Sequence, residues 1–339
     1  LPGAIRYYKR IVESEGAEEE FRLDTRLTLG QFYAATEQYG LAIRQFELWA
    51  EKAFIIGAQQ RLMMAQLYSI LERKDEALKM ADIGISEAEA KGEVPKQGFW
   101  QLQVPIYYDR DNLEKVTSLL EKLVKHYPKW TYWKQLGGMY GSKERDIDQL
   151  VAYDVVYLNG ELSSETDVMS MAYMYLGAEV PFRAAKIIEK GMKDEIIEIS
   201  AKNLEVLGQA WLQAQNLPRA LKAFEGASKL SDTGELQYRI ASIYLDLGQD
   251  KKAYRASLKA ERKGVGKNTA SNYNKMGSAL INLHCYKDAV KVFNKAVKAA
   301  ETKKKKRFPK QWIKFANYEG DRLQRLRDVG ATVPNCSKA

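Results

Sequence analysis

Apolar residues recur three and four positions apart along most of the chain, which is the spacing of one face of an α-helix. The clearest example is residues 207–227, LGQAWLQAQNLPRALKAFEGA, which predicts two short amphipathic helices joined by a turn. Small residues at Gly208 and Ala220 allow the two backbones to approach, and Trp211 and Phe224 fill the remaining space. One such pair cannot bury its whole apolar face, so the pattern predicts neighbouring pairs of the same kind.

Neighbouring pairs are present at a regular period. Each first helix has a small residue, usually followed by an aromatic residue three positions later and an alanine twelve positions later. The aligned small positions are Gly30, Ala65, Val104, Gly137, Ala172, Gly208, Ala241 and Gly277. They lie 35, 39, 33, 35, 36, 33 and 36 residues apart. A period of about 34 residues indicates a stack of two-helix repeats.

One of these repeats has a more complete motif, made of Trp133, Leu136, Gly137 and Tyr140 with Pro128 before it. The motif matches the Trp-Leu-Gly-Tyr pattern of tetratricopeptide (TPR) repeats, and the chain resembles that family over nearly its whole length. The resemblance implies an all-α, TPR-type helical-hairpin solenoid, a right-handed superhelix with a concave groove. We expect about eight repeats, an N-terminal half-repeat in residues 1–16 and a C-terminal capping helix.

The solenoid is expected to occupy residues 1–302. Gly92, Pro95 and Gly98 make residues 91–99 the longest break between repeats, and we expect a loop there that bends the stack. Pro105 falls inside a predicted first helix, where a proline costs about 3 kcal/mol. That helix is therefore expected to start late or to be kinked.

Residues 303–339 are expected to hold a basic linker, a capping helix and a frayed tail. The linker is the run KKKKR at 303–307, and the helix runs from about Pro309 to Val329. Its inward-facing residues are predicted to be Trp312, Phe315, Leu323 and Leu326. Solenoids need such a cap because the last repeat otherwise leaves its apolar face open.

The chain carries a formal net charge of +9, and its cations are mostly mixed with acids along helix faces. This composition favours a solvated surface and permits, without specifying, an anionic membrane surface or nucleic acid as a partner. The KKKKR run is either a connector or an electrostatic contact with anionic lipid or an acidic partner. It has no interleaved aromatic residues, so we expect no nucleic-acid partner. No run of 18 apolar residues is present, so no transmembrane segment is expected.

Motifs for catalysis, cofactors or metals are not found, and the sequence predicts a non-enzyme. The glycine-rich run at 136–141 lacks the strand and the Lys-Ser/Thr of a phosphate loop. His126 and His284 fall in different repeats without partner ligands. Cys285 is expected in a helix turn and Cys336 in the tail, and these separate settings predict two unpaired thiols.

The predicted groove is lined by residues three before, one after and four after each aligned small residue. Its chosen members are Gln66, Met169, Tyr173, Gln209, Tyr238, Ser242 and Asn274. Tyrosine, amide and aliphatic groups together suit an extended peptide or a partner helix. The basic clamp that co-chaperone TPR domains use for a C-terminal carboxylate is absent, since these positions hold residues such as Glu205 and Ser278.

Several segments resemble a narrower subfamily, the TPR proteins encoded with TonB, ExbB and ExbD energy-transduction systems of gamma-proteobacteria. The matching segments are HYPKWTYWKQLGGMY, YLGAEVPFRAAKIIEKGM, the run from KNLEVLGQAW to the SDTGEL turn, and QWIKFANYEGDRLQRL. The resemblance implies an envelope-associated, periplasmic accessory of TonB-dependent transport. The alternatives are a general assembly scaffold and a cytoplasmic location. The chain begins Leu-Pro-Gly in mid-repeat, so we expect a fragment or processed product whose targeting signal lay upstream.

Overall fold

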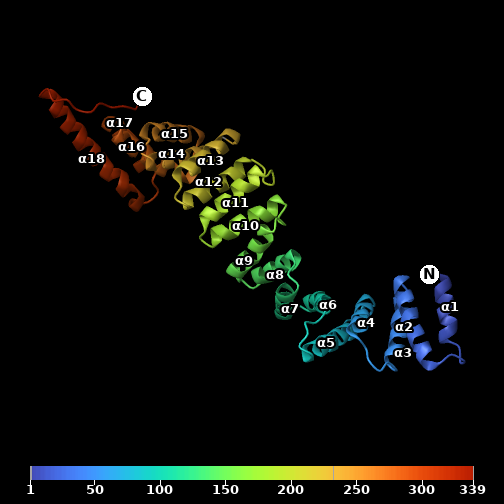
Figure 1. Cartoon of the computed structure of the whole chain (residues 1–339). Helices are drawn as coiled ribbons and strands as arrows, with labels where there is room; N and C mark the ends of the chain where they lie inside the picture. The colour runs from blue at the N-terminus through green and yellow to red at the C-terminus, as the bar shows by residue number, and fades with distance from the viewer. Residues whose placement is uncertain (1, 232, 339) are drawn as a thin grey trace. The chain divides into compact units, whose positions relative to one another are not determined.

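The computed structural model describes residues 2–231 and 233–338, and these residues form helices, turns and loops without any strand (Figure 1). The chain divides into two compact units, residues 1–161 and 162–339. Helices α1–α9 belong to the first unit and α10–α18 to the second. Each unit is a stack of antiparallel helix pairs, as predicted from the repeat period.

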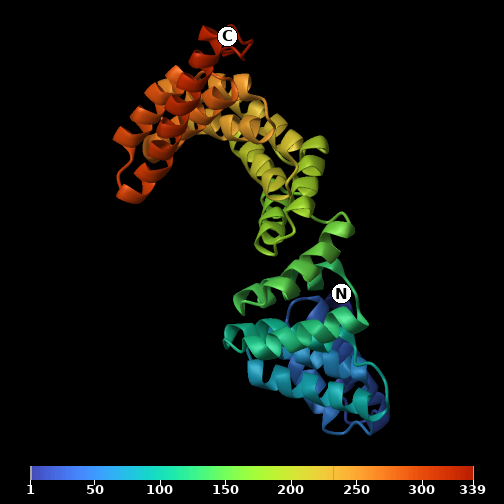
Figure 2. The same cartoon turned by 90° about the vertical axis from the view of Figure 1, so that its left-hand side faces the viewer.

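The two units contain the following helices. In the first unit they are α1 (Pro2–Val12), α2 (Glu19–Ala35), α3 (Tyr39–Ala50), α4 (Ala58–Ile70), α5 (Lys74–Ala90), α6 (Gln97–Asp109), α7 (Leu113–His126), α8 (Trp130–Ser142) and α9 (Asp146–Leu158). In the second they are α10 (Glu165–Gly177), α11 (Pro181–Lys193), α12 (Ala201–Gln213), α13 (Leu217–Leu230), α14 (Gly234–Asp246), α15 (Asp250–Lys263), the 3₁₀ turn η1 (Gly266–Asn268), α16 (Thr269–Asn282), α17 (Tyr286–Ala299) and α18 (Lys303–Asp328). Figure 2 shows the pairs of the second unit stacked one after another.

Every repeat makes its turn at the same position. The residue seven after each aligned small residue has a positive φ, between 56° and 68°, so it adopts the left-handed conformation that closes a helix end. These turn residues are Glu37, Glu72, Asp111, Glu144, Glu179, Gln215, Gly248 and His284. The register predicted from the sequence is therefore confirmed in all eight pairs, α2–α3 to α16–α17.

The two helices of a pair are held together by a small residue that faces a large one. A Cβ placed on Gly208 would lie 2.9 Å from the ring of Phe224, and one on Gly277 would lie 2.6 Å from Phe293. Gly30 meets Phe46 in the same way, and each aromatic residue comes sixteen positions after its glycine. These distances are shorter than carbon atoms tolerate, so an alanine at the glycine would displace the ring.

Neighbouring pairs are tied by a recurring group of three side chains. Tyr68 of α4 donates a hydrogen bond to Glu47 of α3 at 2.9 Å, and Arg73 lies 4.6 Å from the Tyr68 ring and 3.2 Å from the Glu47 carboxylate. Glu121–Tyr140–Arg145 and Glu189–Trp211–Arg219 repeat this arrangement. Burial and the neighbouring glutamate raise the pKa of both Tyr68 and Tyr140 to about 12.

Pro105 neither delays nor ends its helix, because α6 runs unbroken from Gln97 to Asp109. The proline ring is exposed, while Phe99, Trp100 and Ile106 around it are almost fully buried. Packing on both sides of the proline thus outweighs the lost backbone hydrogen bond.

The KKKKR run is not a linker. It forms the start of α18, where the Thr302 hydroxyl caps the helix by accepting a hydrogen bond from the Lys305 amide at 3.2 Å. The predicted start at Pro309 was therefore six residues late. Helix α18 packs on α17 as a cap (Figure 1), with Ala316 and Leu323 buried. Phe315, predicted to face inward, is exposed.

The prediction of two unpaired thiols was wrong, and so was that of a frayed tail. Cys285, at the turn before α17, forms a disulfide with Cys336 in the tail. The Ser337 amide donates to the Leu283 carbonyl at 3.1 Å, and Lys338 pairs with Asp288. The tail residues up to 338 are thereby fixed against the last helix pair. Ala339, the last residue of the predicted tail, lies outside the described residues.

Replacing the ring that fills a glycine position should strongly destabilise the second unit. We expect Phe224→Ala to lower the free energy of unfolding by about 3–5 kcal/mol, because it leaves a cavity at a fully buried site. Leu230→Ala, in the same helix but 58% exposed, should change it by less than about 0.5 kcal/mol. Denaturant unfolding measures both; equal effects would contradict the proposed role of the ring.

Removing the disulfide should loosen the C-terminal end selectively. We expect Cys285→Ser/Cys336→Ser to reduce stability by about 2–4 kcal/mol, since the bond closes a loop of 51 residues. Hydrogen exchange should accelerate in α17, α18 and the tail, while α2 and α3 keep their protection, because repeats contact only their neighbours. Unchanged exchange in the tail of the double variant would show that the disulfide does not hold it.

Candidate functional site

The first helices of the second unit form one layer, in which α14 and α16 contact each other directly. Five of the seven predicted groove residues lie on this layer with their side chains at least partly accessible: Tyr173, Gln209, Tyr238, Ser242 and Asn274. Tyr173, on α10, is 48% exposed. Met169 of the same helix is only 8% exposed and packs into the core, so it offers little surface to a partner.

Helices α12 and α14 are linked across this layer by Arg239. Its Nη1 donates to Gln209 Oε1 at 3.0 Å, and its Nε lies 3.6 Å from the Glu235 carboxylate. Nε is buried yet has no hydrogen-bond partner among the described residues. Arg239 is therefore held in place by Gln209 of α12 and by Glu235 of its own helix.

Helices α14 and α16 are linked by Tyr238. Its side chain is hydrogen bonded to Ser271, and Lys275 Nζ lies 5.1 Å from the centre of its ring. Burial lowers the pKa of Lys275, while the charge of Asp246 acts in the opposite direction. Burial also raises the pKa of Tyr238. The ring and the cation thus form a partly desolvated pair at the surface of the layer.

Asn274 adds an acceptor without a partner. Its Oδ1 is buried and makes no hydrogen bond with any described residue. The Ser242 hydroxyl, by contrast, already has a partner: it donates a hydrogen bond to the Tyr238 carbonyl of its own helix at 3.0 Å. We name Gln209, Tyr238, Arg239, Asn274 and Lys275 the polar row; it offers donors, an acceptor and an aromatic face within one surface.

Gln66 belongs to the first unit and is separate from the polar row. It is exposed on α4 and borders a hollow of about 390 Å³ that Gly98, Gln101, Leu102 and Pro105 of α6 also line. That Gln66 lines a partner-binding groove stays a prediction. Any ligand of this hollow is to be considered independently of the second unit.

Sequence reasoning missed Arg239 and Lys275. Both precede the aligned small residue of their repeat by two positions, whereas the groove was predicted from offsets of three before, one after and four after. Including the position two before each aligned small residue would have identified both. Across the eight repeats, Arg239 and Lys275 are the only Lys or Arg residues at that position.

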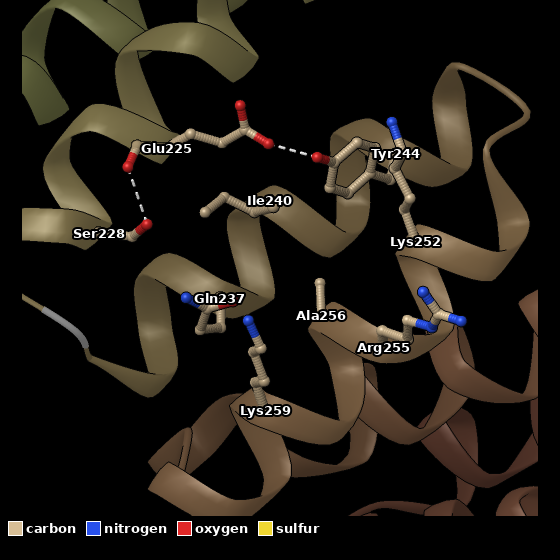
Figure 3. Close-up of a pocket in the computed structure, with 9 residues that line it drawn as sticks. All are labelled: Glu225, Ser228, Gln237, Ile240, Tyr244, Lys252, Arg255, Ala256 and Lys259. Atoms are coloured by element: carbon tan, nitrogen blue, oxygen red, sulfur yellow. Dashed lines mark hydrogen bonds between the residues drawn. The ribbon is translucent and has the colours of Figure 1, made fainter.

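A smaller hollow of about 210 Å³ lies between α13, α14 and α15 (Figure 3). Glu225 stands on one wall, where its carboxylate accepts a hydrogen bond from Tyr244. Lys252, Arg255 and Lys259 of α15 stand on the other. The hollow has no nucleophile beside a base, and no group of three metal-binding side chains occurs among residues 2–231 and 233–338.

Solved structures share this fold at low sequence identity. The structure of Naa15/Naa10 bound to HypK-THB aligns with a TM-score of 0.50 at 15% identity, over 91% of this chain and 47% of that chain. The crystal structure of MamA gives 0.43 at 22% identity, over 52% and 95%. YrrB, described as a TPR protein with an unusual peptide-binding site, gives 0.44 at 14%, over 57% and 97%. Neither a family profile nor a curated protein sequence matches the chain.

The fold is therefore an all-α helical solenoid of the TPR type. No described helix is long and apolar enough to cross a lipid bilayer.

The ionisation of Lys275 tests the environment assigned to the polar row. Its pKa should lie below the ordinary 10.5, and Asp246→Asn should lower it further. Unfolding restores the ordinary pKa. At pH values between the native and the unfolded pKa, the native state therefore binds fewer protons than the unfolded state. Relative to Lys275→Met, wild-type stability should thus rise with pH in that window. NMR titration of the lysine side chain measures the pKa; a value at or above 10.5 would contradict the assigned burial.

Proposed function

We propose that the protein is a non-enzymatic scaffold that binds a peptide or partner protein on the layer of first helices in its second unit. The polar row carries this proposal, because it combines an aromatic ring, two cations and the Asn274 side chain, whose Oδ1 has no hydrogen bond with any described residue. A buried polar atom without a hydrogen bond costs about 1–3 kcal/mol, which a bound ligand would recover.

The chemistry of the polar row favours the backbone of an extended segment or a partner helix with at least one acidic side chain. The partly exposed Arg239 guanidinium would attract a carboxylate, and the Asn274 side chain would accept from an amide. The half-exposed ring of Tyr173 supplies contact area at low entropic cost. Lys275, partly desolvated, would gain from a carboxylate placed near it.

We further propose that the protein is a periplasmic accessory of a TonB-type energy-transduction system. Two observations support this setting. The resemblance to TPR proteins encoded with TonB, ExbB and ExbD covers several segments of the second unit. The Cys285–Cys336 disulfide is typical of an oxidising compartment such as the periplasm. A general assembly scaffold is the alternative if no component of that system binds.

Binding should depend on the two tyrosines of the layer. We expect Tyr173→Ala/Tyr238→Ala to weaken binding of a purified periplasmic TonB or ExbD domain by about tenfold or more, since aromatic anchors contribute about 1–2 kcal/mol each. Tyr318→Ala, a 62% exposed tyrosine on α18, is the matched control and should bind like the wild type. Isothermal titration calorimetry measures both affinities, and circular dichroism checks the fold.

Two outcomes would count against the proposal, and they differ in meaning. If neither domain binds the wild-type protein, the TonB assignment is wrong while the scaffold proposal still awaits another partner. If a domain binds and the double variant binds as tightly as Tyr318→Ala, the binding surface has been placed on the wrong layer.

A further inference from the structure

The charge of the chain is divided unevenly between its two units. Residues 1–161 contain 21 Lys and Arg against 25 Asp and Glu, a net charge of −4. Residues 162–339 contain 32 against 19, a net charge of +13. Such asymmetry between halves is a recognised sign of an interaction with an anionic partner.

Within the second unit, the excess of basic over acidic residues lies on the second helix of each pair. Helices α11, α13, α15 and α17 have net charges of +3, +2, +4 and +3, which total +12. The first helices α10, α12, α14 and α16 have −2, 0, −1 and +1, which total −2. The corresponding second helices of the first unit, α3, α5, α7 and α9, total −5. Repeat architecture alone therefore does not require this charge.

The few acids on these four helices are already engaged by the chain itself. Glu189 accepts from Trp211, Glu225 from Tyr244, and Glu261 from Tyr273 and Lys295. Asp250 accepts from Asn282, and Asp288 pairs with Lys338. They leave a set of exposed cations that form no ion pair or hydrogen bond with the described residues: Arg183, Lys193, Lys222, Lys229, Arg255, Lys259, Arg262, Lys287 and Lys298.

These nine residues, which we name the basic face, are spread over four parallel helices. They do not converge on one pocket. The hollow in Figure 3, which lies within this face, has the Glu225 carboxylate on one wall opposite Arg255 and Lys259, so it is poorly suited to hold a single phosphate. A broad field of separate cations fits an extended anionic surface better than it fits one small ligand.

We propose that the basic face docks the second unit onto anionic lipid headgroups. Most of the cations on the four helices are lysines, flexible point charges that contact phosphates without fixed geometry. Among the described residues of these four helices, Phe182 is the one exposed aromatic residue, and its ring packs edge-on against Trp211. Nucleic acid is therefore the less fitting partner. The docking is independent of the polar row, which lies on the other layer.

The experiment compares the full chain on phosphatidylcholine vesicles with and without phosphatidylglycerol, by flotation. We expect binding only to the anionic vesicles, and we expect it to fall steeply from about 50 to about 200 mM NaCl because the contacts are exposed and screened. Lys222→Glu/Arg255→Glu/Lys259→Glu/Lys287→Glu should weaken binding by about tenfold or more, since each basic residue contributes near an anionic surface.

The matched control reverses four exposed cations of the first unit, Arg10, Lys79, Lys91 and Lys125, to glutamate. It changes the net charge of the chain equally and should leave vesicle binding within about twofold of wild type, because its charges lie off the basic face. Equal loss in both variants, or equal binding to neutral vesicles, would overturn the proposal. Tighter binding to single-stranded DNA or to polyglutamate than to anionic vesicles would overturn the choice of lipid. The variant Tyr173→Ala/Tyr238→Ala should float like wild type, which separates this proposal from that of the groove.

Discussion

The size of the side chains at two positions sixteen residues apart determines how closely the helices of a pair approach. Where the first position is glycine, the second is an aromatic ring, as in Gly208–Phe224 and Gly277–Phe293. Where the first is alanine, the second is smaller: Ala241 is followed by Ser257, and both are fully buried. Close packing penalises both cavities and overlaps, so the two positions must compensate each other. This constraint directs one face of each helix inward and leaves the opposite faces available for other tasks.

The ties between successive pairs use a different kind of interaction. A glutamate from one pair accepts a hydrogen bond from a tyrosine or tryptophan of the next, and a cation usually stacks on that ring. The variant Glu225–Tyr244–Lys252 has a lysine at 5.4 Å in place of the arginine. Several acids that look solvated in the sequence therefore have structural partners. The nine cations of the basic face are thus left without an acidic partner on the same helices.

The sequence allowed the repeat register to be predicted because the register depends on local residue types. Small residues, aromatic residues and left-handed turn positions all recur within one helix pair, so every aligned position was found. The errors depend on contacts that a local pattern does not contain. The disulfide requires the tail to reach the turn at Cys285. That α6 starts well before Pro105 goes with the burial of Phe99 and Trp100, and only the late start, one of the two expected alternatives, was wrong. The start of α18 did not depend on distant contacts. Thr302 is an N-cap residue that can be recognised in the sequence, and it was overlooked. In the candidate site, the pattern placed the tyrosines and amides on an accessible layer but also included Met169, which is buried, and it did not include Arg239 and Lys275.

The surfaces of the two layers of the second unit differ in the burial of their charged groups and in their sensitivity to salt. On the first helices, Lys275 and Tyr238 are partly desolvated and interact at short range, where salt has little influence. On the second helices, the charges are exposed and act together at longer range, where salt weakens them. Packed helices lie about 8–10 Å apart, which is similar to the Debye length of about 8 Å at physiological ionic strength. Through the solvent, the field of the exposed charges on one layer is therefore weakened at the other. A repeat of two helices can thus carry two binding surfaces that vary independently, since a substitution on the outer face of α15 changes neither the register of the pair nor the ligand-facing groups of α14.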